Sequence, residues 1–217
     1  MVLISPPSPL VKPTNPQYVS LDPGDKIMKI YNPERHNTRE NTLRDFGPLF
    51  RFDHHRPLAV KELEKEKGAI DKERRSSYWG FTISCCLVEK FGDTRIIEFK
   101  AYRLAVLTLT ESLELLDLRN SGAMAAGSVA ALNSVADRKL SQAWSNYIYQ
   151  QTDIYGEVDG LMYHNAHNGE DSIVLYERCE ARIQSSVIKS RYLKNRSLRH
   201  LIDKCAVNHG MACFEPY

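Results

Sequence analysis

Apolar positions cluster along this chain in the pattern of several short β-strands. Residues 26–31 (KIMKIY) predict a first strand, and residues 113–118 (LELLDL) predict another. The run at residues 95–110, rich in Leu and β-branched side chains, predicts a pair of long strands. Residues 160–166 and 171–178 predict two closing strands joined by the turn-forming HNGED.

Helical patterns lie between and after these strands. Tyr78 and Trp79 are predicted to end a strand that leads into a helix over residues 83–91, with Gly92 as its C-cap. Residues 122–132 and 134–151 are also predicted to be helical. In the second of these, the large apolar side chains fall near one helical face: Val135, Leu140, Trp144 and Tyr147.

The C-terminal region, residues 187–210, is read as one more helix. Leu198, Leu201 and Ile202 would form its apolar stripe beneath a basic face. A solvated amphipathic helix and a nucleic-acid-binding element both fit this charge pattern, and the first is the plainer interpretation.

The irregular order of strands and helices favours an α+β fold over a doubly wound parallel sheet. Residues 24–217 are expected to form a single domain. Residues 1–23 hold six prolines, which block helices and sheet ladders. We therefore expect an extended arm that lies on the domain, frays from it or contacts another copy in an oligomer. Residues 61–75, densely charged with both signs, are expected to be a solvated helix or loop.

Composition narrows the class of protein. The 217 residues are 42% hydrophobic and 26% charged, as in soluble globular domains, and no run is long enough to span a membrane. The N-terminus lacks the pattern of a secretory signal, so a cytoplasmic location is expected. A net charge of +2 does not indicate nucleic acid as a partner. Five cysteines without a CxxC spacing predict neither disulfides nor a zinc ribbon.

Arg51 is the first candidate for chemistry. It lies between Phe50 and Phe52, and a guanidinium flanked by aromatic rings is suited to bidentate binding of a phosphate. The alternative is a strand in which every second residue faces solvent. Nearby His54 and His55, with His164 and His167, raise the question of a metal, but adjacent residues on a strand point to opposite faces, so no metal is expected.

Glu89 and Tyr78 form the second candidate. Glu89 lies in an apolar helical run, where a carboxylate either joins a structural hydrogen-bond network or does acid, base or electrostatic work. Eleven residues separate it from Tyr78, and a strand-to-helix corner could bring both to one cleft. Asn165 and Asn168 are the third candidate, because amides can bind ribose hydroxyls; turn formation is the alternative, particularly for Asn168 before Gly169.

In their order along the chain, these segments resemble the RES domain, which is named for Arg, Glu and Ser residues. GPLFRF resembles the element that supplies the Arg, SSYWG with LVEKF resembles the Tyr and helix-Glu element, and residues 157–178 resemble the closing segment. The resemblance runs from Lys26 to Arg178. It implies a fold related to ADP-ribosyltransferases, a mainly antiparallel sheet core with flanking helices, NAD as the substrate and an Xre-type antitoxin as the partner.

The chain departs from the family at two positions. Asn165 stands at the family's Ser position, and Lys29, followed closely by Tyr31, stands where an early Arg is usual. Lys keeps the charge of Arg but lacks its fork of donors. The resemblance implies that Glu89 stabilises the developing cation, that Tyr78 stacks on the nicotinamide or its ribose, and that Asn165 orients the ribose or acceptor. It assigns NAD binding to Arg51, Lys29 and Tyr31.

The expected function is therefore that of an NAD-consuming, toxin-like enzyme that cleaves the nicotinamide–ribose bond, as a glycohydrolase or a phosphorylase. Two alternatives remain open at this point. One is an ADP-ribosyltransferase with a protein target. The other, suggested by the two departures, is a catalytically silent RES-like module that binds a protein or a nucleotide.

Overall fold

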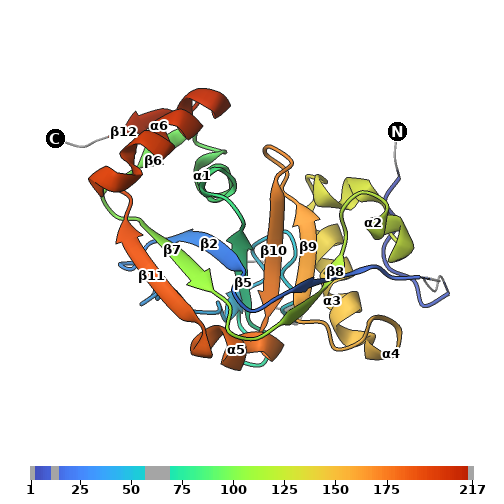
Figure 1. Ribbon diagram of the computed structural model, residues 1–217. Helices are drawn as coiled ribbons and strands as arrows, with labels where there is room; N and C mark the ends of the chain where they lie inside the picture. The colour runs from blue at the N-terminus through green and yellow to red at the C-terminus, as the bar shows by residue number, and fades with distance from the viewer. Residues whose placement is uncertain (1–2, 11–14, 57–68, 215–217) are drawn as a thin grey trace.

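The centre of the molecule is a curled, mainly antiparallel sheet (Figure 1). The computed structural model describes residues 3–10, 15–56 and 69–214. Within them the sheet strands are β1 (Tyr18–Leu21), β2 (Lys26–Tyr31), β5 (Ser76–Gly80), β7 (Arg103–Thr108), β8 (Leu113–Asp117), β9 (Gly160–His164), β10 (Asp171–Tyr176) and β11 (Val187–Tyr192). Their order is β1-β8-β9-β10-β5-β2-β7-β11, and only β8 and β9 run parallel to each other.

Shorter elements complete the fold. Two small sheets pair β3 (Phe46–Gly47) with β4 (Ala69–Ile70) and β6 (Ile96–Glu98) with β12 (Ala212–Phe214). The α-helices are α1 (Ile83–Phe91), α2 (Gly122–Ala125), α3 (Arg138–Gln150), α4 (Thr152–Tyr155), α5 (Glu180–Ser185) and α6 (Arg196–His209). Two 3₁₀ turns are η2 (Ala130–Asn133) and η3 (Glu177–Cys179).

The central sheet is joined in its middle by one residue pair. β2 pairs with β7 along its whole length, but it pairs with β5 only through Met28 and Gly80. We call β1, β8, β9, β10 and β5 the five-stranded half, and β2, β7 and β11 the three-stranded half. Beyond the junction, Arg44 forms an isolated bridge with Ser76 at the start of β5. The segment after β2 therefore pairs with the start of β5, which β2 itself does not reach.

The corner between β5 and α1 has a local explanation. The Thr82 side chain caps the helix by accepting a hydrogen bond from the Cys85 amide (2.9 Å), an interaction worth about 1 kcal/mol. A Cβ at Gly80 would lie 2.6 Å from Cys85 Sγ, so glycine permits the close approach of the helix to the strand. The buried side of α1 includes Leu87 and Phe91.

Successive residues of β5 face opposite sides of the sheet. Tyr78 packs on the apolar cluster that includes Val174 and α3, whereas Trp79 packs on the cluster that includes Ile173 and reaches α5. A third cluster lies beneath α1 and α6, which sit together over the three-stranded half, while α2, α3 and α4 gather at the five-stranded half (Figure 1). The side of the sheet that carries Tyr78 and α1 also carries the candidate site.

Several predicted elements are present with close bounds: the first strand at β2, the β5–α1 corner with Gly92 as C-cap, β8, and the β9–β10 hairpin. The helical prediction for residues 134–151 is confirmed in α3, although Val135 precedes the helix. The prediction for residues 122–132 is confirmed in α2 and η2, which are separate short turns.

Other predictions are wrong in part. Tyr18–Leu21, within the expected N-terminal arm, forms β1 and pairs with β8. The two strands of residues 95–110 exist but do not pair with each other, because β6 pairs with β12 and β7 with β2 and β11. In residues 187–210, Val187–Tyr192 is a strand and only α6 is helical.

The apolar stripe of α6 also differs from the prediction. Ile202 is buried and Leu198 packs on the same cluster, but Leu201 is 48% exposed, and the buried side continues through Cys205 and Ala206. Of the charged stretch at residues 61–75, residues 61–68 lie outside the described part of the chain, and Ala69–Ile70 is β4. No helix in the described ranges is both long enough and apolar enough to cross a membrane.

Candidate active site

Glu89 and Tyr78 come from the two elements of the β5–α1 corner. Tyr78 is half-buried on β5, and Glu89 lies on the exposed side of α1. Because α1 folds back over the same side of the sheet that Tyr78 faces, the corner brings the phenol ring and the carboxylate to one region. The predicted strand-to-helix arrangement is the one observed.

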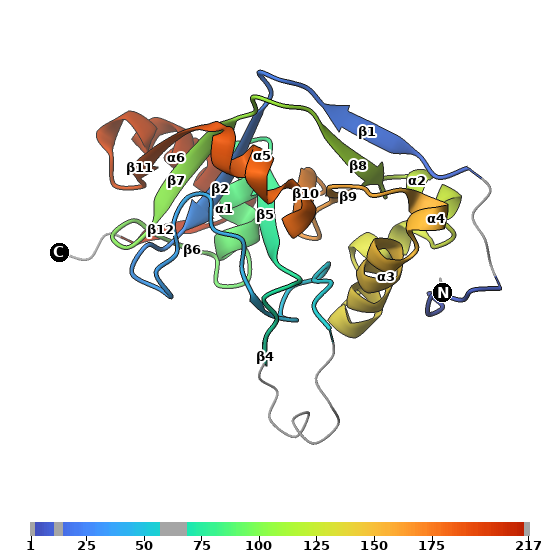
Figure 2. The ribbon, with the colours of Figure 1, turned by 90° about the horizontal axis from the view of Figure 1, so that it is seen from below.

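Arg51 reaches this region from the loop after β3. Its Nη1 donates a hydrogen bond to the Val135 carbonyl, just before α3. Its neighbour Phe52 is fully buried, and the Phe52 ring lies 4.6 Å from that of Tyr163 on β9. Figure 2 shows the loop, in cyan, beside α3. The alternative of a strand with alternating solvent-facing residues is wrong, since residues 48–56 form an irregular loop in which the four consecutive residues 52–55 are buried.

Charges in this region act on one another. Arg51 and Glu89 each shift the other's pKa, and Arg138, at the start of α3, acts on both. His167, in the β9–β10 turn, also acts on Glu89. Arg138 is held by the Leu49 carbonyl (3.1 Å), so a second guanidinium is fixed beside the Arg51 loop. The result is one carboxylate whose pKa is lowered by the charges of His167, Arg51 and Arg138 and raised by that of Asp93. We call Arg51, Tyr78, Glu89 and Arg138 the candidate active site.

The Glu89 carboxyl is accessible to solvent, yet its surroundings influence its protonation. Desolvation raises its pKa above the ordinary value of 4.5, while the charges of His167 and Arg51 oppose that rise. An accessible carboxylate with a raised pKa, beside fixed cations, can stabilise a positive charge that develops on a ligand.

Tyr78 contributes its ring to the site, because its hydroxyl is already bonded on both sides. The hydroxyl accepts a hydrogen bond from the Phe52 amide (3.1 Å) and donates one to Asp53 Oδ1 (2.8 Å). Burial and the Asp53 charge raise the pKa of Tyr78 well above its usual value, so the phenol stays protonated. The exposed Phe50 ring meets the Tyr78 ring edge-on, with centroids 5.5 Å apart.

Lys29 and Tyr31 lie elsewhere. On β2 they share a sheet face with Ile27, whereas Met28 and Ile30 face the cluster under α1. Lys29 Nζ donates to the Thr42 carbonyl and the Ser77 hydroxyl and lies 4.5 Å from the centre of the Trp79 ring. These contacts place Lys29 on the Trp79 side of the sheet. The structure does not bring it to Arg51, Tyr78 and Glu89.

The environments of these two side chains are structural in character. Burial lowers the pKa of Lys29 to about 7, and the Glu40 carboxylate opposes this effect. The Tyr31 hydroxyl donates to Glu40 (3.2 Å) and lies 3.4 Å from the Ser190 hydroxyl on β11. The candidate active site therefore does not include Lys29 and Tyr31.

Asn165 organises the β9–β10 turn. Its Oδ1 accepts hydrogen bonds from the amides of His167 and Asn168, and its Nδ2 donates to Asn168 Oδ1 (2.7 Å). The following Gly169 has φ +73°, a conformation that favours glycine. Both ends of the Asn165 amide are thus engaged, and Nδ2 also donates to Cys85 Sγ (3.5 Å), so Asn165 joins the turn that carries His167 to the helix that carries Glu89.

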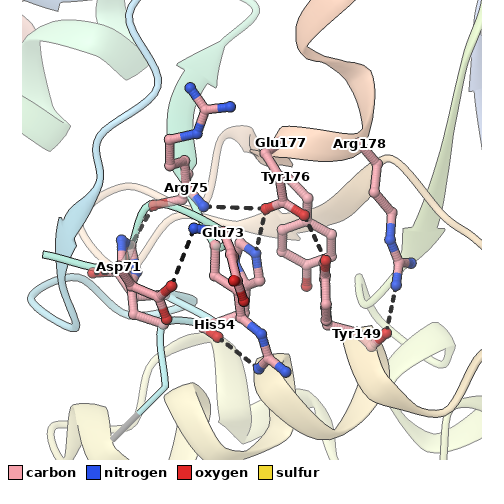
Figure 3. A network of polar contacts seen from close by, with 12 residues as sticks. His54, Asp71, Glu73, Arg75, Tyr149, Tyr176, Glu177 and Arg178 are labelled. Atoms are coloured by element: carbon pink, nitrogen blue, oxygen red, sulfur yellow. Dashed lines mark hydrogen bonds and ion pairs between the residues drawn. The ribbon is translucent and has the colours of Figure 1, made fainter. Parts of the chain in front are cut away.

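The four histidines considered for a metal have separate partners. His54 belongs to a buried polar network in which Glu177 accepts hydrogen bonds from Tyr149 Oη and the Arg75 amide and lies 2.9 Å from His54 Nε2 (Figure 3). His55 Nε2 lies 3.2 Å from the Arg44 carbonyl oxygen, His164 pairs with Asp171, and His167 pairs with Asp93. Among the described residues, no group of three or more His, Cys, Asp or Glu side chains is arranged to hold a metal ion.

The sequence interpretation missed two residues that shape the site. The sequence around Arg138 gives little indication of a binding role. An arginine next to Asp137 at the predicted start of a helix looks like an ordinary solvent-exposed helix end. Asp53 is fully buried and bonds to Arg44 as well as to Tyr78. Its position two residues after Arg51 is visible in the sequence, but its partners are far apart along the chain.

Two hollows on the described surface lie away from the candidate active site. One measures about 250 Å³ and the other about 310 Å³, and both are lined by Phe99. The first is bordered by α6 residues and the second by Phe214, and neither includes Arg51, Tyr78 or Glu89.

Comparison with known proteins gives a likeness in fold. No family model matches the sequence, and no curated protein matches it. A solved structure that does match is the crystal structure of the M. tuberculosis MbcT–MbcA toxin–antitoxin complex. The match has 15% identity and a TM-score of 0.57, and it covers 87% of this chain and 92% of that one. This likeness shows the fold. It confirms the predicted α+β class, a mainly antiparallel sheet core with flanking helices.

Proposed function

We propose that this chain is a toxin-like enzyme that consumes NAD by breaking the bond between nicotinamide and ribose. The observation that carries the proposal is the Glu89 carboxylate in the field of Arg51 and Arg138, with the Tyr78 side chain also acting on Arg51. The fold likeness to a chain of a toxin–antitoxin complex supports the same reading, as does the ordered resemblance to RES domains.

The chemistry of NAD matches what these residues offer. The nicotinamide nitrogen carries a positive charge, so when the glycosidic bond breaks, its electron pair neutralises the leaving group and no acid is needed. Positive charge then develops on the ribose, as in other glycosyl transfers. Water adds to the anomeric carbon and loses a proton to solvent, which gives ADP-ribose and nicotinamide; phosphate as acceptor gives ADP-ribose 1″-phosphate.

Each residue has a distinct part in this scheme. Glu89 stabilises the ribosyl cation electrostatically, and Arg51 with Arg138 binds the diphosphate. The Tyr78 ring, with the exposed Phe50 ring beside it, packs against the nicotinamide or its ribose. Asn165 acts from a distance, through the turn that holds His167. The scheme gives Lys29 and Tyr31 no contact with NAD.

The decisive experiment incubates the purified protein with NAD, with and without phosphate, and measures free nicotinamide. Release of nicotinamide supports the proposal, and the sugar product identifies water or phosphate as the acceptor. Transfer of labelled ADP-ribose to protein would show a transferase instead. NAD binding without turnover would show a silent binding module, and the proposed function would be withdrawn.

Arg51→Ala should weaken NAD binding with a smaller effect on the chemical step. Loss of a charged hydrogen bond costs about 1.5–3 kcal/mol, which corresponds to a rise in KM of roughly 10- to 150-fold. Arg51→Lys should recover only part of this loss, because Lys keeps the charge without the bidentate fork. Steady-state kinetics of nicotinamide release measure both, with Arg35→Ala as an exposed control. An unaltered KM in Arg51→Ala would remove Arg51 from substrate binding.

The partner proposed for this chain is an antitoxin protein of the Xre type. The RES resemblance implies that type, and the structural neighbour comes from a toxin–antitoxin complex. Expression of the wild-type chain should then be toxic to cells, and co-expression of the cognate antitoxin should relieve the toxicity.

A further inference from the structure

One carboxylate outside the proposed substrate contacts is unusually well bonded. Asp53 is fully buried, and its two oxygens accept hydrogen bonds from two backbone amides and three side chains. The donors are Leu49 N (2.6 Å), Phe50 N (2.9 Å), Arg44 Nη2 (2.6 Å to each oxygen), Ser76 Oγ (3.1 Å) and Tyr78 Oη (2.8 Å).

These bonds fix the loop that carries Arg51 at both ends. Before Arg51, Asp53 Oδ2 binds the amides of Leu49 and Phe50 and so closes a turn. After Arg51, the Phe52 amide donates to the Tyr78 hydroxyl, which in turn donates to Asp53 Oδ1. The Arg51 backbone is therefore held between two sets of bonds that meet at one carboxylate.

The charge of Asp53 is maintained by its partners. Burial alone would raise its pKa, but the Arg44 guanidinium and the hydrogen bonds from Arg44, Leu49 and Phe50 hold that pKa below its ordinary value. Arg44 in turn covers the Phe50 ring, with its guanidinium carbon 4.8 Å from the ring centre. Asp53 thus organises Phe50, Arg51 and Tyr78 while remaining anionic.

We propose that Asp53 is the positioning residue of the NAD site: it never touches substrate, and it fixes Arg51 and the Tyr78 ring in the arrangement that binds NAD. The inference rests on the proposed function and deepens it. It also gives the Tyr78 hydroxyl a structural role, because the hydroxyl both accepts and donates a hydrogen bond within the protein. Only the Tyr78 ring is then left to contact the ligand.

The test compares Asp53→Asn and Tyr78→Phe with wild type in three measurements: NAD affinity by calorimetry, nicotinamide release, and hydrogen exchange of the Leu49, Phe50 and Phe52 amides without NAD. Asp53→Asn should weaken NAD binding and raise KM at least tenfold, with a smaller change in kcat. The three amides should exchange at least tenfold faster. Tyr78→Phe keeps the ring and should accelerate the Phe52 amide most.

Asp159→Asn is the matched control. Asp159 is likewise buried, pairs with Arg182 and accepts a hydrogen bond from the Glu114 amide, but it lies outside the Arg51 loop. It should leave NAD affinity and the three amides unchanged. A purely structural role for Asp53 would lower stability alone, whereas a positioning role predicts that the double variant Asp53→Asn with Arg51→Ala loses less affinity than the sum of the two single losses.

Two outcomes would overturn the inference. The first is normal NAD affinity in Asp53→Asn, and the second is strictly additive losses in the double variant. Failure of the proposed function is distinguishable, because it appears in the wild type as NAD binding without nicotinamide release. If Asp53→Asn does not fold, Tyr78→Phe removes two bonds of the same arrangement, those to the Phe52 amide and to Asp53 Oδ1, and tests the same expectation.

Discussion

Glu89→Gln should abolish nicotinamide release while the fold stays intact. Glutamine has the shape of glutamate but no charge, so it cannot stabilise a cation on the ribose. Removal of one electrostatic contribution of this kind typically lowers kcat by about 100- to 1,000-fold, and we expect at least the lower figure. NAD affinity should change little, because Arg51 and Arg138 remain. Turnover within fivefold of wild type would exclude Glu89 from this role.

The same variant should be at least as stable as wild type at neutral pH. The folded-state pKa of Glu89 is raised above 4.5, so the folded protein holds this proton more tightly than the unfolded chain does. The free energy of unfolding therefore falls as pH rises from 4.5 through the folded-state pKa. At pH 7 the charged carboxylate destabilises the folded state, and the uncharged glutamine removes this effect. Thermal unfolding at pH 7 measures this, with the exposed Glu157→Gln as control.

Protonation of Glu89 should also determine how kcat/KM falls at low pH. Because the anion is the active form, kcat/KM of the wild type should decline on the acid side with an apparent pKa above 4.5. Any residual activity of Glu89→Gln should lack this decline.

Glu177→Gln should cause a large loss of stability. Glu177 sits at the centre of the network in Figure 3, where it binds Tyr149, the Arg75 amide and His54. Burial would raise its pKa, but the hydrogen bonds from His54 and Tyr149 lower it to about 2. A pKa of about 2 in place of 4.5 corresponds to about 3 kcal/mol of unfolding free energy at pH 7.

The pH dependence of that loss follows from the sign of the shift. The stabilisation is fully present above pH 4.5 and disappears as pH falls through about 2. Denaturant unfolding of wild type and Glu177→Gln should therefore differ most at neutral pH and converge near pH 2. Glu180→Gln, which breaks a partly exposed pair with Arg75, should cost less than about 1 kcal/mol. Equal losses from the two substitutions would contradict this account of the network.

Local signals were enough to predict the β5–α1 corner and the β9–β10 hairpin. A polar N-cap, an apolar run and a glycine specify α1 without reference to the rest of the chain, and Asn168 with Gly169 specifies a turn. Tyr78 and Glu89 lie on the two elements of that corner, which is why a shared region could be predicted for them, whereas Arg51 lies in an irregular loop and was grouped with them through the RES resemblance.

Features that depend on distant partners could not be predicted in this way. The alternation of β2 shows that Lys29 and Tyr31 share a face, but only the assembled sheet shows that this face is the one opposite Tyr78. β11 is a basic strand whose spacing also suits a helix, and its identity is decided by pairing with β7. β1 was concealed by its proline-rich surroundings, although Tyr18–Leu21 contains no proline.

The joining of the two sheet halves through Met28 and Gly80 has a consequence for how this chain can be divided. The chain passes repeatedly between the halves, so that a cut in any loop from Leu21 to Ala212 separates strands that are hydrogen-bonded to each other. No fragment would contain all the strands with which its own strands pair. We therefore expect that no such fragment folds by itself and that the central sheet does not form strand by strand during synthesis. β6 and β7 emerge from the ribosome well before β12 and β11, so the pairing of these strands must wait for the later ones.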